Sequence, residues 1–288
     1  MSQAPASAPL LGLLTDFGLS DGYVGVMKAV VLTIVPGASL VDISHDVAPQ
    51  DVEMGAWLLS TVWRYFPVGS VLLCVVDPGV GSSRRAIALQ AHGRVFVGPD
   101  NGLFTSPLVD EPEGEAPLRC ASLDNERYHL RSVSSTFHGR DIFASVAAHV
   151  LAGAPVSALG FAVDPATLIR LTVARQAEWQ GDAVVGRVAH IDHYGNLITN
   201  IGPQLARQAL SQATARVSVA GRELRASATH FAAGPAKEPF FLQDSSGALA
   251  IAVRGGSAAA ILGARRGDTV ALTGLTSAME GRTDADGK

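Results

Sequence analysis

Short apolar runs alternate with longer helical patterns up to about residue 160. The runs "LLGLLTD" (10–16), "ASLVDIS" (38–44) and "SVLLCVVD" (70–77) are predicted strands, and the third is apolar on both faces. Between them, "GYVGVMKAVVLTIVP" and "PQDVEMGAWLLSTVWRYFP" have helical length and spacing, and Asp51 is a predicted N-cap of the second helix. Strands that are apolar on both faces and alternate with helices indicate a mostly parallel sheet covered by helices.

The same half of the chain continues with two more strand patterns, "RAIALQ" and "RVFVGP", which are joined by a turn at "AHG". A loop is predicted at "DEPEGEAP" (110–117), and "GRDIFASVAAHVLAG" is a predicted helix with Gly153 just beyond its end. We therefore predict an N-terminal α/β domain over residues 10–165, preceded by a loose leader over residues 1–9.

The pattern changes after about residue 160. Short β-type runs separated by glycine and polar turns follow one another: "AVVGRVAHIDHYGNLITNI", "ARVSVAGREL", "EPFFLQDSS", "ALAIAVRGG" and "DTVALTG". Only "PQLARQALSQA" has a helical pattern among them. This arrangement is typical of a small antiparallel sheet or barrel. The fold class predicted for the chain is α/β, with a smaller C-terminal antiparallel β-barrel-like domain over residues 175–276 and a polar tail over residues 277–288.

Composition and charge narrow the function. The net charge of −4 gives no electrostatic footprint for nucleic acid or for an anionic membrane surface. Apolar stretches are interrupted before they reach the length of a membrane span. The two cysteines, Cys74 and Cys120, form no metal-binding pattern. The first residues, "MSQAPASAPL", do not have the pattern of a signal peptide, so a cytoplasmic protein is the default expectation.

Three predicted strands end at or just before carboxylates: Asp16, Asp46 and Asp77. In open α/β sheets ligands bind beyond the carboxyl ends of the strands, so several carboxylates at that edge favour a polar site. Any one of them can instead cap a turn. The run "TFHGRDIFA" adds His138 at a helix entry, where the following glycine lets a ligand approach the backbone. We expect Asp141 of that run to lie in the first helical turn.

The stretch "VVDPGVGSSRR" (75–85) permits other interpretations. It resembles a phosphate-binding nest, but it lacks the Gly-Lys-Ser/Thr ending of a P-loop. A metal site made from Asp16, Asp77, His45 and His138 is a second alternative, although an arginine beside Asp77 would compete with a cation. Neither alternative is favoured. We expect Arg85 to be solvated or to pair at the surface.

Seven motifs together resemble one known family. They are "TDFG–SDGYVGVMK", "VDISHDVAPQDVEMGA", "VVDPGVGSSRR", "VGPDNGL", "TFHGRDIFA", "IDHYGNLITNI" and "SSGALAIAVRGGSAAAILG", in this order along residues 10–275. In this respect the chain resembles the S-adenosylmethionine hydrolases, also called S-adenosylmethionine hydroxide adenosyltransferases, which are relatives of fluorinase and chlorinase.

The resemblance implies a homotrimer whose active sites lie where one subunit's N-terminal domain meets a neighbour's C-terminal domain. It implies that water attacks C5′ of S-adenosylmethionine and yields adenosine and L-methionine, without a metal or other cofactor. The residues that it implies to activate the water are Asp77, Arg84 and His138. The residues that it implies to bind substrate are Asp16 at the ribose, Asp21, Asp192 and Ser245 at the methionine portion, Tyr194, Asn196 and Phe231 at the adenine, and also Gln50, Gly139 and Gly255.

The resemblance also distinguishes branches of the family. The halogenases carry a tyrosine at the position of Asp77, and fluorinase carries a serine at that of Gly139 and a tryptophan at that of Gln50. A carboxylate would repel a halide, so Asp77 favours water as the nucleophile. Arg254 and Ser246 depart from the family pattern. A halide-using adenosyl transferase and a non-catalytic binder of S-adenosylmethionine are the remaining alternatives, and the physiological role of the breakdown is left open.

The reaction implied by the resemblance needs no general acid, because methionine leaves the sulfonium as a neutral thioether. A guanidinium beside Asp77 favours its charged form, which makes the carboxylate a weak base for generating free hydroxide. We therefore expect Asp77 to orient the water and to accept its proton late in the reaction. His138 is expected to share or relay that proton.

Overall fold

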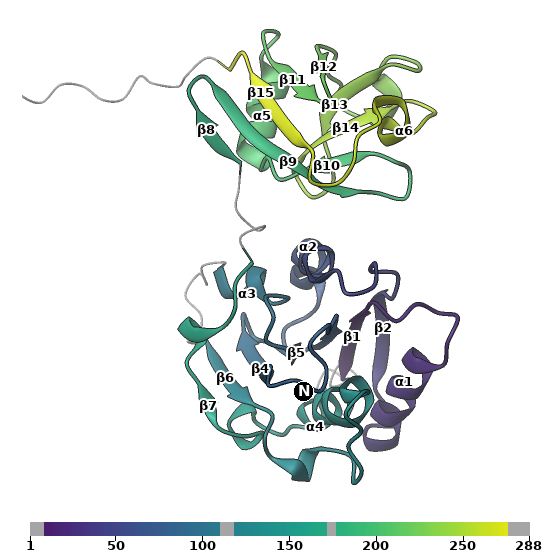
Figure 1. The fold of residues 1–288 in the computed structure, drawn as a ribbon, viewed down its shortest axis with the longest axis vertical. Helices are drawn as coiled ribbons and strands as arrows, with labels where there is room; N and C mark the ends of the chain where they lie inside the picture. Colours follow the sequence, from purple (N-terminus) through teal and green to yellow (C-terminus); the bar gives the residue numbers. More distant parts are fainter. Residues whose placement is uncertain (1–8, 110–117, 172–176, 276–288) are drawn as a thin grey trace, which may run out of the picture. The chain divides into compact units, whose positions relative to one another are not determined.

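The computed structural model describes residues 9–109, 118–171 and 177–275. The chain divides into two compact units, residues 1–174 and residues 175–288, and each is treated by itself (Figure 1). Residues 1–8 of the predicted leader, the predicted loop at 110–117 and the predicted tail at 277–288 lie outside the described residues.

The N-terminal unit is built on one seven-stranded sheet with the order β2-β1-β3-β5-β4-β6-β7. Four neighbouring strands are parallel: β2 (Ser39–Ser44), β1 (Leu10–Thr15), β3 (Val71–Val75) and β5 (Arg94–Pro99). The other three pair antiparallel: β4 (Ala86–Ala91), β6 (Arg119–Ser122) and β7 (Ala162–Val163). The predicted strands of this half are confirmed, and β6 and β7 extend the sheet beyond the prediction.

Helices cover both faces of this sheet, as the predicted fold class requires (Figure 1). Helices α1 (Tyr23–Ile34) and α4 (Ser145–Leu151) pack on one face, and α2 (Val52–Val62) and α3 (Thr105–Val109) pack on the other. Shorter helical turns are η1 (Trp63–Tyr65), η2 (Glu126–Tyr128), η3 (Gly139–Ala144), η4 (Val156–Ala158) and η5 (Pro165–Thr167). Strand β3 is buried along its whole length between the two helical layers, which accounts for its unbroken apolar sequence.

The start of α2 illustrates how local sequence fixes an element. The carboxylate of Asp51 accepts a hydrogen bond of 2.9 Å from the backbone N–H of Met54, so Asp51 is the N-cap, as predicted. Ala56 and Leu59 then place one face of the helix against the sheet, and Trp63 of η1 packs in the same core. In the described ranges 9–109, 118–171 and 177–275, no helix is long and apolar enough to cross a membrane.

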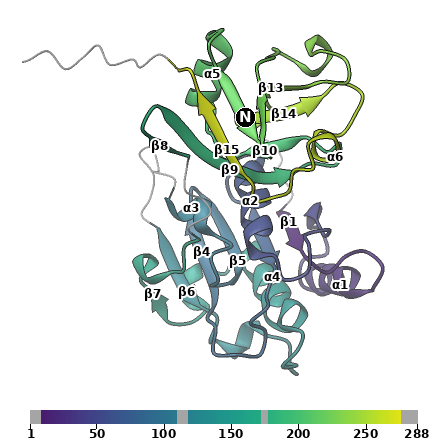
Figure 2. The same cartoon turned by 45° about the horizontal axis from the view of Figure 1, so that its top comes forward.

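The C-terminal unit is an antiparallel, barrel-like sheet with the path β12-β11-β15-β9-β10-β14-β13, and β8 pairs with β9 off this path. Its strands are β8 (Glu178–Gln180), β9 (Ala183–Ile191), β10 (Leu197–Thr199), β11 (Arg216–Val219), β12 (Arg222–Leu224), β13 (Pro239–Gln243), β14 (Leu249–Val253) and β15 (Thr269–Thr273). Figure 2 shows β15 beside β9, where they pair in register. Its helices are α5 (Pro203–Ser211), α6 (Ala258–Leu262) and the turn η7 (Phe231–Ala233).

The ends of this sheet nearly meet. The segment after β12 reaches β13, because the N–H of Phe241 donates to the carbonyl of Ala226 at 3.0 Å and the N–H of Ala228 donates to the carbonyl of Phe241 at 3.0 Å. Closing a sheet on itself satisfies backbone groups that an open edge would expose. The predicted small antiparallel barrel is therefore confirmed as a shape, and α6 is a helix that the sequence pattern did not indicate.

Gly98 sets how closely β5 approaches β3. A Cβ atom added at Gly98 would lie 2.1 Å from the backbone oxygen of Cys74, which is far too close for two non-bonded atoms. Gly98→Ala is therefore expected to lower the free energy of unfolding by about 1–3 kcal/mol, the cost of overpacking a tight core. Urea denaturation measures this difference.

The matched control is Gly37→Ala. Gly37 is exposed and a Cβ added there would meet nothing within 4 Å, so its unfolding free energy should change by no more than about 0.5 kcal/mol. Equal stability of the Gly98 and Gly37 variants would contradict the packing account.

Candidate active site

The carboxylate of Asp77 and the guanidinium of Arg84 form an ion pair just beyond the end of β3, at the edge of the sheet. Asp77 follows the buried residues Val75 and Val76, and its side chain is only 6% exposed. The Nε atom of Arg84 lies 3.0 Å from both carboxylate oxygens, and its second terminal nitrogen donates to Oδ2 at 2.6 Å. Multiple short bonds between a guanidinium and a carboxylate fix both groups in one orientation.

His138 completes a row of three side chains through the same guanidinium. Its Nδ1 atom lies 2.9 Å from the terminal nitrogen of Arg84 that also contacts Asp77. An arginine can only donate, so Nδ1 accepts this hydrogen bond and the ring proton lies on Nε2. Burial and the charge of Arg84 lower the pKa of His138 below its usual value, so the imidazole is neutral at neutral pH.

The glycine turn after Asp77 brings Arg84 back to the acid. Gly81 has a φ of 77°, and a Cβ added there would lie 2.6 Å from the carbonyl oxygen of Ser135. The hydroxyl of Ser82 donates to the carbonyl of Gly79 at 2.7 Å and accepts from the N–H of Arg84 at 3.2 Å. The turn is therefore tight, and it packs against the segment that leads to His138.

The helix that begins after His138 differs from the expected one. Residues 139–144 form a π-helix that continues as α4, whereas the sequence predicted a single regular helix. Such bulges are frequent at functional sites. Gly139 is the first π-helical residue, and a Cβ added there would lie 3.2 Å from the ring of Phe17 and 3.3 Å from that of Phe137. The ring of Phe143 lies under the guanidinium of Arg84, 5.1 Å away.

Asp141 lies in this first helical stretch, as expected, and its role there is structural. Its side chain is fully buried. It pairs with Arg140 at 2.5 Å and accepts a hydrogen bond of 2.8 Å from the N–H of Ser134. These contacts hold the segment on which His138 sits, because they join residues on both sides of it.

Asp16 and Asp77 leave the sheet at the same edge. Thr15 of β1 pairs with Val75 of β3 in parallel register, so both acids follow neighbouring strand ends. Asp16 accepts a hydrogen bond of 2.7 Å from the N–H of Gln50, which has a φ of 67°. Asp46 follows β2 and is exposed, as is Asp21 in the turn before α1.

The alternative metal site is not assembled by the side chains that the sequence suggested. His45 is buried, and its Nδ1 lies 2.8 Å from the hydroxyl of Thr15 while its Nε2 lies 3.1 Å from Asp42. Within the described ranges of the chain, no three His, Cys, Asp or Glu side chains cluster as metal ligands.

In the C-terminal unit, Asp192, Tyr194 and Asn196 share one turn between β9 and β10. Oδ1 of Asp192 accepts from the N–H of Tyr194 at 2.9 Å and of Asn196 at 2.8 Å, and Oδ2 accepts from the side-chain amide of Asn196 at 2.8 Å. Both oxygens of Asp192 thus serve the turn. Tyr194 itself is left 76% exposed on this turn.

The remaining predicted residues of this unit lie on three other turns. Phe231 is 49% exposed at the start of η7. Arg254, which departs from the family pattern, donates to the carbonyl of Ala232 beside it at 3.2 Å, and Gly255 follows with a φ of 72°. Ser245 is exposed in a turn between β13 and β14. Asp244 accepts hydrogen bonds from the N–H and the hydroxyl of Ser246 there.

Arg85 agrees with its expectation in part. Its side chain is 39% exposed and it reaches the exposed Thr167, but it also pairs with the buried carboxylate of Asp100, which is 3% exposed. Asp100 and Asn101 belong to the motif "VGPDNGL", but no site role is predicted for them from the sequence. Their contacts join segments far apart in the chain, so no local pattern reveals them.

Known proteins are similar to this chain along most of its length. The model of the SAM hydroxide adenosyltransferase N-terminal domain matches residues 11–160, and that of the C-terminal domain matches residues 186–271. A protein named (R)-S-adenosyl-L-methionine hydrolase from Salinispora tropica is 39% identical over 270 residues, 93% of this chain and 99% of that protein.

Two further proteins are similar to this chain. A fluorinase from an Actinoplanes species is 28% identical over 217 residues, 67% of this chain and 72% of that enzyme. The crystal structure of an uncharacterized conserved protein from Thermotoga maritima superposes with a TM-score of 0.82 at 37% identity, covering 91% of this chain and 99% of that one. With both domain models matched and a relative of this identity over nearly the full length, the chain belongs to the SAM hydroxide adenosyltransferase family.

Proposed function

We propose that this protein is an enzyme that hydrolyses S-adenosyl-L-methionine to adenosine and L-methionine by attack of water at the ribose C5′. The observation that carries the proposal is the row Asp77–Arg84–His138, in which one guanidinium contacts both an acid and an imidazole. The hydrolase name of the relative from Salinispora tropica supports the same substrate.

In this reaction the oxygen of water bonds to C5′ while the bond from C5′ to sulfur breaks and its electron pair stays on sulfur. Methionine leaves as a neutral thioether, so no acid has to protonate it. The water must be held in line with the breaking bond, and such positioning is worth up to roughly 7–11 kcal/mol. Arg84 holds the acid that orients the water.

The proton of the water goes to Asp77 in this mechanism. Nδ1 of His138 is occupied by Arg84 and its Nε2 carries a proton, so the imidazole is a donor toward the site rather than a base. Oδ1 of Asp77 accepts one bond, from Nε of Arg84 at 3.0 Å, whereas Oδ2 accepts two from the same guanidinium. Oδ1 therefore has more capacity left for the water and its proton.

The negative charge of Asp77 also selects the nucleophile. A carboxylate at the nucleophile position repels a halide and attracts a hydrogen of water. We therefore favour water over a halide. A non-catalytic binder would have no need for an acid held by three short hydrogen bonds from one arginine.

The remaining assignments follow the resemblance. Asp16 binds the ribose hydroxyls, Asp21 and Ser245 bind the methionine portion, and Tyr194 and Phe231, both with exposed rings, stack on adenine. The resemblance implies that Asp192 binds the methionine portion, but both its oxygens are used within the turn that carries Tyr194 and Asn196, so we propose instead that Asp192 shapes this turn. Gln50, Gly139 and Gly255 line the substrate through their backbone. We also propose that the enzyme works without a cofactor and is cytoplasmic.

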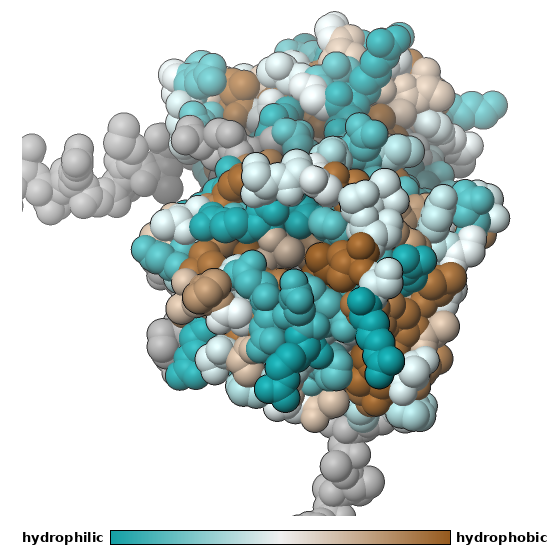
Figure 3. Space-filling model, turned by 60° about the horizontal axis from the view of Figure 1, so that its bottom comes forward, coloured by the Kyte–Doolittle hydropathy of each residue, from teal (hydrophilic) through white to brown (hydrophobic). Residues whose placement is uncertain are grey.

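A homotrimer with active sites between subunits is the proposed assembly. Figure 3 shows hydrophobic side chains gathered on the side of the N-terminal unit where α1 lies in Figure 1. Val26 and Leu32 of α1 are 42% and 39% exposed, and Val41 of the edge strand β2 is 41% exposed. Exposed apolar side chains that gather in this way favour a contact between subunits.

Changing this surface should dissociate the assembly. Val26→Lys and Leu32→Lys each place a charge in the proposed contact, so sedimentation velocity should show monomers where the wild type is a trimer, with a parallel loss of activity. Val68→Lys is the control, because Val68 is 73% exposed at a separate turn before β3. Trimers that survive both α1 substitutions would contradict this contact surface.

Removing the acid should cost far more than removing the imidazole. Asp77→Asn keeps the shape of the side chain and loses the proton acceptor, so kcat for adenosine release should fall about 100- to 10,000-fold. His138→Gln loses one donor and should lower kcat about tenfold, equivalent to about 1.4 kcal/mol. Chromatography of released adenosine measures both.

Asp46→Asn is the matched control, because Asp46 is an exposed carboxylate beyond the edge strand β2, which β1 separates from β3. Its kcat should equal that of the wild type. A larger loss in His138→Gln than in Asp77→Asn would overturn the assignment of the proton to Asp77, and wild-type rates in both variants would overturn the site.

A further inference from the structure

The motif "VGPDNGL" lies at the end of β5 and takes no part in the reaction described so far. Its two polar residues, Asp100 and Asn101, contact opposite ends of the loop between Asp77 and Arg84. This loop carries two of the three proposed catalytic groups. The positions of its two ends therefore affect how the carboxylate of Asp77 and the guanidinium of Arg84 meet.

Asn101 holds the first end. Its side-chain nitrogen donates to the carbonyl of Val76 at 2.8 Å, and Val76 directly precedes Asp77. The side-chain oxygen of Asn101 accepts from the N–H of Leu103 at 3.2 Å. Since the oxygen is used by Leu103, the amide has one orientation, with its donor facing Val76.

Asp100 holds the second end through Arg85, the residue that follows Arg84. Oδ2 of Asp100 accepts from Arg85 at 2.8 Å and 2.6 Å, and the backbone N–H of Asp100 donates to the carbonyl of Arg85 at 2.9 Å. The carboxylate is 3% exposed. A pair with one shielded partner is screened by salt much less than a surface pair.

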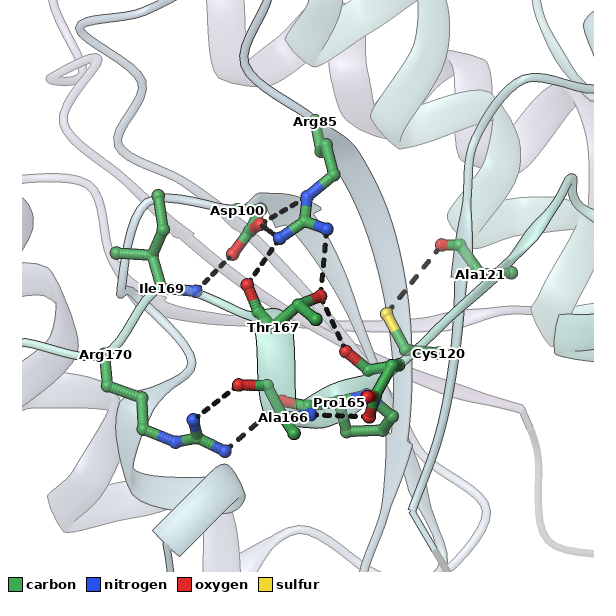
Figure 4. A network of polar contacts seen from close by, with 10 residues as sticks. Arg85, Asp100, Cys120, Ala121, Pro165, Ala166, Thr167, Ile169 and Arg170 are labelled. Carbon is green, nitrogen blue, oxygen red and sulfur yellow. Dashed lines mark hydrogen bonds and ion pairs between the residues drawn. The ribbon is translucent and has the colours of Figure 1, made fainter.

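The same carboxylate also fastens the segment at residues 164–171, as Figure 4 shows. Oδ1 of Asp100 accepts from the N–H of Ile169 at 2.9 Å. Arg85 donates to the hydroxyl of Thr167 at 3.1 Å and to its carbonyl at 2.7 Å. With both oxygens of Asp100 and three nitrogens of Arg85 engaged, neither side chain can turn without breaking several hydrogen bonds.

We propose that Asp100 and Asn101 are positioning residues that, with Arg85, clamp the two ends of the loop carrying Asp77 and Arg84. The inference rests on the proposed hydrolysis. None of the three touches the row of catalytic side chains, so they act through the backbone on either side of it. A displacement of about 1 Å in such a group costs about 100-fold in rate even when the change lies far from the chemistry.

The test is steady-state kinetics of Arg85→Gln and Asn101→Asp with S-adenosyl-L-methionine. Asn101→Asp keeps the oxygen that Leu103 uses and turns a second oxygen, in place of the donor, toward the carbonyl of Val76. In each variant kcat should fall about 10- to 100-fold while KM stays within about threefold, because the loop is misplaced and the substrate contacts remain.

Arg170→Gln is the matched control. Arg170 donates to the carbonyls of Ala166 and Pro165 at 3.1 Å and 3.2 Å in the same segment, yet contacts neither end of the loop. Its kcat and KM should match those of the wild type. Arg85→Lys keeps a cation opposite Asp100, so it should recover much of the kcat lost in Arg85→Gln. Thermal unfolding identifies variants that are folded at the assay temperature.

Wild-type kcat in folded Arg85→Gln and Asn101→Asp would overturn the clamp, and so would an equal loss in Arg170→Gln. If Arg85→Gln does not fold, Asn101→Asp against Arg170→Gln carries the same comparison. Failure of the proposed function looks different, because the wild type and Arg170→Gln would then release no adenosine. An active wild type, an inactive Asp77→Asn and normal clamp variants would refute this inference alone.

Discussion

The guanidinium of Arg84 is the group on which the proposed chemistry depends. It holds the carboxylate of Asp77 through three contacts and the imidazole of His138 through a fourth. This one cation thereby fixes the orientation of the Asp77 carboxylate and the tautomer of neutral His138. Because arginine stays protonated, it donates to both groups as long as Asp77 is ionised and His138 is neutral. The contacts of this single group therefore explain why Asp77 is proposed to accept the proton of the water and why the His138 imidazole is proposed to donate a hydrogen bond.

The fold positions the row Asp77–Arg84–His138 at one edge of the N-terminal sheet. Parallel strands β1 and β3 end at one edge, so Asp16 and Asp77 lie beyond neighbouring strand ends without further design. Gly98 lets β5 lie close against β3, and that approach places Asp100 and Asn101 next to the same edge. The path from sequence to function thus runs through the packing of two strands. The loop from β3 to β4 is shaped by glycines, but polar contacts at its ends fix its place.

Local patterns predicted much of this. The apolar run of β3, the N-cap Asp51 and the alternation of strands with helices each carry their signal within a few residues. The π-helix after His138 and the pairing of Arg85 with Asp100 have no such signal. The residues of the first have the spacing of a regular helix, and the second joins residues 15 apart in the chain. The order of the seven motifs identified the family where individual contacts remained hidden.

The central claim is that water bonds to C5′ while the carbon–sulfur bond breaks. It is tested most directly by incubating the protein with S-adenosyl-L-methionine in oxygen-18 water and analysing the products by mass spectrometry. The account predicts that adenosine gains one heavy oxygen at the 5′ position and that methionine gains none. Adenosine without the label, or intact S-adenosyl-L-methionine after long incubation, would contradict it.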